Sequence, residues 1–221
     1  MTTQRDADDE RLEATLIARS RAGDTRAFNQ LVERHQASAY ALALRMVGDP
    51  DVAADVTQDA FFSAYRAINA FKGASFRAWL YRIVSNSCFD HFRAQGRHPA
   101  TSLDAALGAE PGESSGPTGE ARLGSALVDP SYDPEGITLR VEMIEQIQRA
   151  LLQLAPEQRL AVILCDVQGL PYDEIARIMN TAPGTVKSRI SRARGRLREI
   201  LAAQPELFGS GDRQSTERER H

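Results

Sequence analysis

Apolar residues in the first half of the chain recur every three or four positions, which is the repeat of an α-helix. A long apolar-rich stretch from Leu31 to Val47 contains no turn residue and ends at the turn signal Gly48-Asp49-Pro50. Asp49 is expected to cap the next helix, because its carboxylate can accept the free amide protons of a first turn. That helix has a predicted inward stripe of Val52, Val56, Ala60, Ser63 and Ala67. After a short loop at 71–76, a third helix is predicted from about Arg77 to Phe92, so the first half is expected to be all-α.

The second half of the chain shows the same helical repeat in shorter segments. Helices are predicted at 137–154 and at 156–167, and Gly169 is expected to end the second of these. Two further helices, at 172–179 and at about 182–201, are joined only by Asn180-Thr181. So tight a connection between two helices is typical of a helix-turn-helix. The predicted fold class is all-α, with two small helical domains.

Composition separates the two halves. Residues 97–135 contain five Gly, five Pro and five Ser, with seven acidic residues against two arginines. This composition buries too little apolar surface to offset the entropy cost of ordering, which predicts a flexible acidic linker. The predicted organisation is therefore a domain at 10–96, a linker at 97–136, a second domain at 137–203 and a polar tail at 204–221.

The whole chain has 221 residues, of which 42% are hydrophobic, and a net charge of −3. No apolar run approaches the roughly 20 residues that a membrane-spanning helix needs, and the N-terminus resembles no secretory signal. Two cysteines cannot build a disulfide framework. We expect a cytoplasmic protein without direct membrane insertion, in which Cys88 and Cys165 are unreactive thiols on apolar stretches.

The net charge conceals a strongly basic segment, Lys187–Arg198, which has six basic residues and no acidic one. At 100° per residue, Val186, Ile190, Ala193 and Leu197 form its buried face. The opposite face offers hydroxyls to base edges and cations to phosphates, as a helix in a DNA major groove does. A solvated cationic face is the alternative, but the helix-turn-helix context favours DNA binding. The candidate contacts are Thr185, Lys187, Ser188, Arg189, Ser191, Arg192 and Arg194.

Two stretches of this sequence together resemble one protein family. LPYDEIARIMNTAPGTVKSRISRARGRLRE resembles region 4 of the extracytoplasmic-function (ECF) group of bacterial sigma factors. DPDVAADVTQDAFFSAYRAINAFKGASFRAWLYRIVSNSCFDHFR is similar to region 2 of the same group, in the expected order. The resemblance implies an alternative sigma factor that binds core RNA polymerase and directs promoter-specific initiation. The second domain would read the −35 element as duplex DNA, and the first would melt and capture the −10 element.

The helix at 50–67 carries candidate polymerase contacts. Asp55, Gln58 and Asp59 stand at i, i+3 and i+4, so they share one polar surface. The resemblance implies that this surface docks on the clamp helices of the largest polymerase subunit, with Phe62 and Tyr65 as apolar contacts. At least one of Phe61 and Phe62 is expected to belong to the core. The resemblance also implies contact with the polymerase β flap, and regulation by an anti-sigma factor that covers both domains.

The loop at 71–76 and the helix after it carry candidate contacts for separated promoter strands. Unstacked bases are held by stacking and by hydrogen bonds to their edges, while cations follow the backbone. The candidates are Lys72, Ser75, Phe76, Arg77, Asn86 and Arg93. This loop, FKGASF, is one residue shorter than in many family members, so the resemblance implies the mechanism rather than the base preference.

Catalysis has little support in the sequence. The linker glycines follow no strand and lack a GK[ST] motif, and Cys88 and His91 have no evident third or fourth metal ligand. We therefore expect no enzyme activity, cofactor, metal or small-molecule substrate. Two other classes stay open at this point: a DNA-binding regulator that never joins polymerase, and a purely structural interaction protein.

Overall fold

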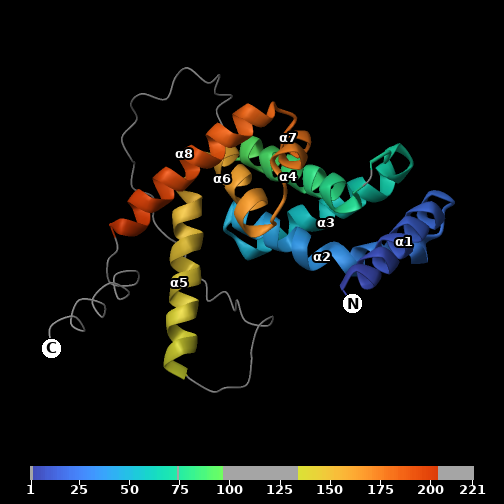
Figure 1. The fold of residues 1–221 in the computed structure, drawn as a ribbon, viewed down its shortest axis with the longest axis horizontal. Coiled ribbons are helices and arrows are strands. Elements are labelled where there is room, and N and C mark those ends of the chain that lie inside the picture. The colour runs from blue at the N-terminus through green and yellow to red at the C-terminus, as the bar shows by residue number, and fades with distance from the viewer. Residues whose placement is uncertain (1, 74, 97–133, 204–221) are drawn as a thin grey trace.

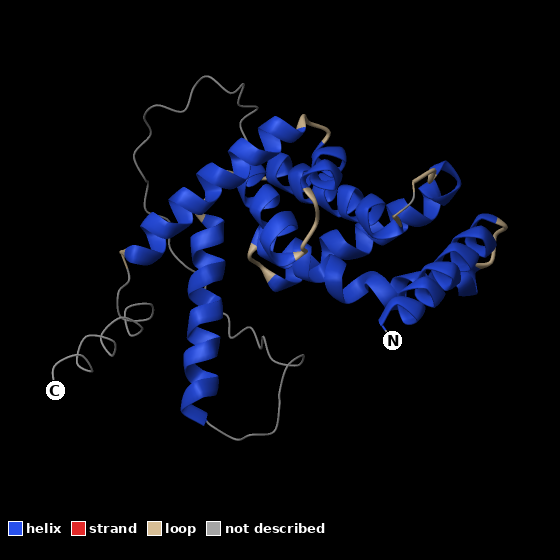
Figure 2. Ribbon diagram, in the orientation of Figure 1, coloured by secondary structure: helices blue, strands red, loops and turns tan. Residues whose placement is uncertain are grey.

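The computed structural model describes residues 2–73, 75–96 and 134–203, and within these ranges the chain is helical with no strand (Figure 2). The predicted tail at 204–221 and most of the predicted linker, 97–133, lie outside the described residues. In chain order the described elements are α1 (Thr2–Arg21), α2 (Thr25–Val47), α3 (Pro50–Ala67), η1 (Ile68–Ala70), α4 (Phe76–Ala94), α5 (Pro134–Leu152), α6 (Pro156–Val162), η2 (Ile163–Val167), α7 (Tyr172–Met179) and α8 (Pro183–Ala202) (Figure 1). The all-α prediction is confirmed.

Helix α1 was not anticipated from the sequence, and the predicted domain start at residue 10 falls inside it. Its sequence is mostly polar, and its apolar anchors are Leu16 and Ile17, which are buried. The helix packs along α2. Because polar helices gain their stability from such packing rather than from a clear apolar repeat, the periodicity signal was weak here.

Asp49 caps α3, as the sequence predicts. The Asp49 carboxylate accepts hydrogen bonds from the backbone N–H groups of Asp51 and Val52, at 2.9 and 3.1 Å, and Pro50 occupies the first turn. Just before it, Gly48 ends α2 in the left-handed region at φ +82°. A Cβ at this position would also meet a methyl group of Leu152 at 2.5 Å, so the backbone conformation favours glycine and any larger residue would have to displace the Leu152 side chain.

The predicted inward stripe of α3 is wrong in one position. Ser63 is exposed, whereas the buried face consists of Ala53, Val56, Thr57, Ala60, Phe61 and Ala64. Helix α3 packs on both α2 and α4. Because α3 packs against two helices, its buried face is wider than a single stripe. That face includes Phe61 and Ala64 and excludes Ser63.

The helix-turn-helix is formed by α7 and α8. Asn180 lies in the left-handed region at φ +49° and ends α7, so the chain turns directly into α8. Val186, Ile190 and Ala193 are buried, and Leu197 is partly buried against the core, which confirms the predicted inner face. The predicted helix at 156–167 is α-helical to Val162 and continues as one π turn, η2.

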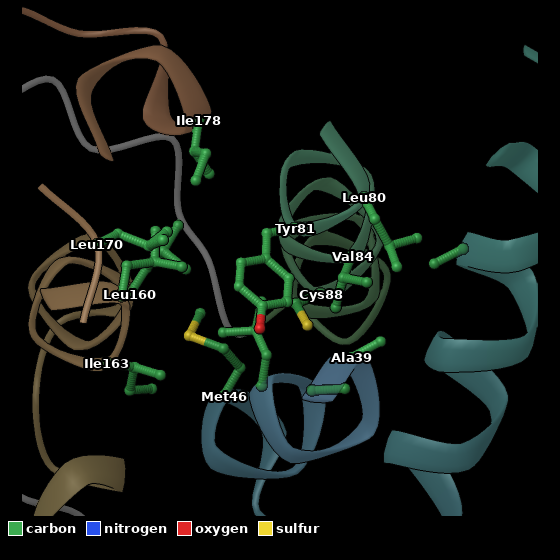
Figure 3. Close-up of a cluster of buried hydrophobic side chains, with 14 of the residues drawn as sticks. Ala39, Met46, Leu80, Tyr81, Val84, Cys88, Leu160, Ile163, Leu170 and Ile178 are labelled. Carbon is green, nitrogen blue, oxygen red and sulfur yellow. The ribbon is translucent and has the colours of Figure 1, made fainter. Parts of the chain in front are cut away.

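The two halves of the chain share one hydrophobic core, which the sequence had not indicated. Met46 of α2 and Tyr81 of α4 lie beside Leu160 and Leu170 of the second half (Figure 3). The Tyr81 hydroxyl donates a hydrogen bond to Oε1 of Gln168 at 2.6 Å. The sequence predicts two separate modules. In the structure, α2 and α4 bury apolar residues against the second half as well as against the first.

A buried arginine joins the halves. Arg159 is only 7% exposed, and its guanidinium donates hydrogen bonds to the backbone carbonyls of Met46, Leu152 and Leu154. It also lies 5.9 Å from the centre of the Phe92 ring. Burial lowers the pKa of Arg159 to about 10, so the guanidinium stays charged at neutral pH. A single cation thus satisfies carbonyls at the end of α2 and between α5 and α6.

Candidate polymerase-docking groove and DNA interface

An apolar groove of about 720 Å³ lies between α2 and α3. Its aromatic lining comes from both helices: Phe28, Tyr40, Phe61, Phe62 and Tyr65. Phe61 is buried and Phe62 is 54% exposed, so the expectation that one of the two belongs to the core is confirmed. An aromatic side chain exposed to this extent on a groove wall is typical of a protein-docking site.

Two carboxylates of α3, Asp55 and Asp59, each follow a residue that lines the groove, Ala54 and Gln58. Asp55, Gln58 and Asp59 are all exposed, and Gln58 lines the groove itself. Tyr65 is 39% exposed, with its ring against Phe28 and its hydroxyl 3.3 Å from Oγ1 of Thr25. All five predicted polymerase contacts of this helix are therefore exposed, and three of them, Gln58, Phe62 and Tyr65, line the groove.

The loop at 71–76 is anchored by its terminal aromatic residues. Phe71 is 4% exposed and Phe76 is completely buried, while Lys72 between them is exposed. Phe76 was predicted as a DNA contact, but in this structure its ring lies in the core rather than in solvent. Ser75 caps α4, its hydroxyl accepting the backbone N–H of Ala78 at 3.1 Å, so its side chain supports the helix start.

The remaining candidates on α4 fall on two sides of the helix. Asn86 and Arg93 are exposed and seven residues apart, which places them about 20° apart around the helix axis. Arg93 pairs with Asp90 at 2.8 Å on the surface. Arg77 is exposed in the first turn, but nine residues before Asn86 it lies about 180° around the axis. Asn86 and Arg93 thus form one face, and Arg77 belongs with the loop.

The outward face of α8 is cationic, as predicted. Lys187, Ser191 and Arg192 are exposed, and Thr185, Ser188 and Arg189 are half-buried. The Ser188 hydroxyl donates to the carbonyl of Thr185 at 2.9 Å. Among the described residues, no carboxylate lies within ion-pair distance of Lys187, Arg189 or Arg192. Their charges are available to a polyanion.

Arg194, predicted among the DNA contacts, forms an ion pair with Asp166 of the same chain. Its guanidinium donates two hydrogen bonds to the Asp166 carboxylate, at 2.5 and 3.0 Å. The Arg194 hydrogen bonds hold the pKa of Asp166 below its usual range, and the same pair raises the pKa of Arg194. This bidentate pair ties α8 to η2, a connection between residues 28 positions apart that the sequence did not reveal.

A further apolar surface, missed in the sequence, lies on α5. The helix extends away from the other helices for most of its length (Figure 1), and Val141, Met143, Ile144 and Ile147 are 38–50% exposed. Their three- and four-residue spacing is visible in the sequence and predicts a helix there, but it does not show which face of that helix stays exposed. Exposed apolar stripes of this kind mark interaction surfaces.

Neither cysteine is in an environment that activates a thiol. Burial raises the pKa of Cys88 to about 12. Partial burial and the neighbouring Asp166 raise the pKa of Cys165. In the described part of the chain there is no group of three potential metal ligands, and no helix there is long and apolar enough to cross a membrane.

Comparison with known proteins agrees with this arrangement. Residues 31–98 match sigma-70 region 2, and residues 144–197 match sigma-70 region 4. The chain is 42% identical over 180 residues to the ECF RNA polymerase sigma-E factor of Escherichia coli K12, covering 81% of this chain and 88% of that protein. It is 38% identical to the RNA polymerase sigma-H factor of Pseudomonas aeruginosa, over 84% of this chain and 92% of that one.

Two solved structures resemble the fold. CnrH in complex with the cytosolic domain of CnrY matches with a TM-score of 0.59 and 27% identity, over 87% of this chain and 99% of that one. The sigma factor RpoE of Bartonella quintana, in complex with the anti-sigma factor NepR, matches with a TM-score of 0.57 and 29% identity, over 80% of this chain and 98% of that one.

A helix-turn-helix with a cationic outer face, packed on a helical domain with an apolar groove, is the architecture of a DNA-binding transcription factor. The chain belongs to the ECF sigma factors of the sigma-70 family. Its function is promoter-specific transcription initiation.

Arg192 and Arg194 are expected to behave differently in DNA binding, because only Arg194 is paired internally. In holoenzyme on a promoter fragment, Arg192→Ala should reduce the slope of log affinity against log salt by about 1, the value of one phosphate contact. Arg194→Ala should leave that slope unchanged. Equilibrium binding over a salt series measures both variants, and an equal loss of slope in the two would show that Arg194 leaves Asp166 to bind DNA.

Proposed function

We propose that this chain joins core RNA polymerase through the α2–α3 groove and contacts promoter DNA through the loop at 71–76, the outer face of α4, and α8. The observation that supports this most strongly is the presence, on one chain, of an apolar groove on a helix with exposed carboxylates and of a helix-turn-helix whose Lys187, Arg189 and Arg192 pair with no carboxylate among the described residues. A DNA-binding regulator acting alone would need only the second of these features.

The groove suits a helical, basic partner. Phe62 and Tyr65 offer apolar surface for burial, and Asp55 and Asp59 offer negative charge beside it. Apolar anchors with charged residues at the rim are the usual composition of a specific protein interface. In the proposed complex this surface binds the clamp helices of the largest polymerase subunit, and Gln58 hydrogen-bonds to the same partner.

The exposed stripe on α5 is the proposed second contact with polymerase. Val141, Ile144 and Ile147 face solvent on a helix that stands away from the rest of the chain. Burying them against an apolar element would contribute about 25 cal/mol per Å² of surface removed from water. We propose that the polymerase β flap supplies the apolar surface that covers this stripe.

The −35 element is read as duplex DNA by α8. Ser188 and Ser191 lie centrally on the outward face and reach base edges, while Lys187, Arg189 and Arg192 neutralise phosphates. The −10 element is held as separated strands by exposed Lys72 of the loop and by Asn86 and Arg93 on α4. Phe76 and Ser75 then support this site instead of contacting DNA.

The proposed role involves no catalysis by this chain, because polymerase forms the phosphodiester bonds and binding energy opens the strands. The chain acts in the cytoplasm, where polymerase and promoter DNA are found. Since a related sigma factor was solved with an anti-sigma factor bound, we also propose that an anti-sigma factor regulates this chain by covering both halves.

Reconstitution with core bacterial RNA polymerase tests the proposal. The purified chain should co-elute with core enzyme and should produce discrete run-off transcripts from a fragmented genomic template that core enzyme alone does not produce. The start sites of these transcripts would define both promoter elements. Retained duplex binding without co-elution would contradict the proposal and would instead indicate a DNA-binding regulator.

A further inference from the structure

The loop at 71–76 rests on a fixed aromatic base. The ring centres of Phe71 and Phe76 lie 6.0 Å apart, and the Trp79 ring contacts them at 5.2 and 5.5 Å. Lys72 and Gly73 are exposed, between these two buried ends. The direction in which Lys72 points therefore depends on what holds Phe71 and Phe76 in place.

Arg21, the last residue of α1, holds the first end of the loop. Its guanidinium donates hydrogen bonds to the backbone carbonyls of Ile68 and Phe71. It also lies 5.7 Å from the centre of the Phe71 ring, within cation–π range. Hydrogen bonds from a charged donor are stronger than neutral ones, and two of them from one planar group fix the path of the backbone.

An acid–histidine pair supports the second end. Glu13 of α1 and Nε2 of His35 on α2 are 2.9 Å apart, and both side chains are largely shielded from solvent. The His35 ring lies 5.2 Å from that of Phe76. The hydrogen bond from His35, its charge and that of Arg34, and the backbone N–H of Phe76 lower the pKa of Glu13. Glu13 thus stays ionised and connects α1 to the start of α4.

Packing alone does not account for these contacts. Leu16 and Ile17 already bury the apolar side of α1 against the core. Arg21, by contrast, donates hydrogen bonds to the backbone carbonyls of Ile68 and Phe71. These polar contacts are not needed to bury the apolar side of α1. The region 2 match begins at residue 31, after α1, so the matched region does not include this helix.

We propose that α1 is the positioning element of the −10 loop. Arg21 fixes the first end and the Glu13–His35 pair fixes the second, so that Lys72 meets the separated promoter strand in one geometry. This inference rests on the proposed function of the loop. Preorganisation of this kind matters because a binding site loosened by about 1 Å loses much of its affinity.

The test compares Arg21→Ala with Arg11→Ala in reconstituted holoenzyme. Arg11 is on the same helix, but it is solvent-exposed and pairs only with exposed Asp8. Arg21→Ala should reduce strand opening at least tenfold, measured as permanganate reactivity of unpaired thymines in the −10 region, and should weaken binding of a single-stranded −10 oligonucleotide similarly. Arg21→Lys should be intermediate, because an ammonium cannot reproduce the fork. Arg11→Ala should match the wild type.

Core affinity, duplex binding and the thermal midpoint of each variant separate positioning from general destabilisation. Under the proposal these change little in Arg21→Ala, and Glu13→Ala impairs opening in the same selective way. A parallel loss of core affinity, duplex binding and thermal stability would overturn the proposal, since α1 would then be only a structural support.

Two loop-site variants distinguish the failure of this inference from that of the proposed function. If Lys72→Ala and Asn86→Ala impair opening but Arg21→Ala does not, the positioning role is wrong and the −10 site stands. If Lys72→Ala and Asn86→Ala also leave opening unchanged, the loop is not the −10 site, and the positioning role fails with it.

Discussion

Reversing two carboxylates beside the α2–α3 groove should abolish assembly with polymerase. The double variant Asp55→Lys, Asp59→Lys is expected to bind core enzyme at least ~100-fold more weakly, which corresponds to about 2.7 kcal/mol. The physical reason is that each lysine places a positive charge against a basic partner, and like charges at an interface cost several kcal/mol. Both residues are exposed and belong to no hydrogen-bonded cap, so the fold should tolerate the change. Titration of labelled protein with core enzyme measures the affinity.

The matched control is Asp8→Lys, Glu10→Lys, which makes the same change in charge at exposed positions of α1 outside the groove. It should bind core enzyme with near wild-type affinity. Binding of nonspecific duplex DNA by the free chain should be retained in both variants, since α8 is unchanged. If both double variants lost core affinity equally, net charge rather than the groove would govern assembly.

Replacing Arg159 by methionine should cause a large loss of stability in the shared core. We expect the free energy of unfolding to fall by about 3 kcal/mol. Methionine fills much of the same volume but leaves the carbonyls of Met46, Leu152 and Leu154 without their donor in a buried site. The gain from no longer burying a charge offsets part of this cost. Urea denaturation followed by circular dichroism measures the difference.

Arg149→Met is the control for this substitution. Arg149 is 60% exposed and forms only a surface pair with Glu145 at 3.1 Å, so its loss should change stability by less than about 0.5 kcal/mol. Equal effects from Arg149→Met and Arg159→Met would show that the contacts of Arg159 across the two halves contribute no more than a surface ion pair.

The helices that could be predicted from the sequence are those whose signals lie within a few residues. Asp49 and Pro50 start α3 through contacts with the next turn, and Asn180 ends α7 through its own backbone conformation. The faces of α8 follow from the helical repeat alone, since Val186 and Ile190 are separated by about one turn. Exposure of Asp55, Gln58 and Asp59 could be predicted for the same reason.

Features that join distant parts of the chain could not be predicted in this way. The pairing of Arg194 with Asp166 spans 28 residues, and that of Arg159 with Met46 spans 113. A cation in a basic helix has the same local pattern whether it faces DNA or a carboxylate on another helix. The buried Phe76 ring likewise contacts His35, which is distant in the sequence, as well as Trp79, which is one turn away on the same helix.

The sequence by itself therefore determined the helices after α1, the Asp49 cap, the cationic face of α8 and the family, because these depend on local spacing and on recognisable motifs. Only the tertiary structure decided that α1 contacts the loop at 71–76, that Phe76 lies inside, that Arg194 is paired, and that the two halves share one core around Arg159. The physical reason is that hydrogen bonds and apolar contacts depend on distance in space, which the helical repeat specifies within one helix and not between helices.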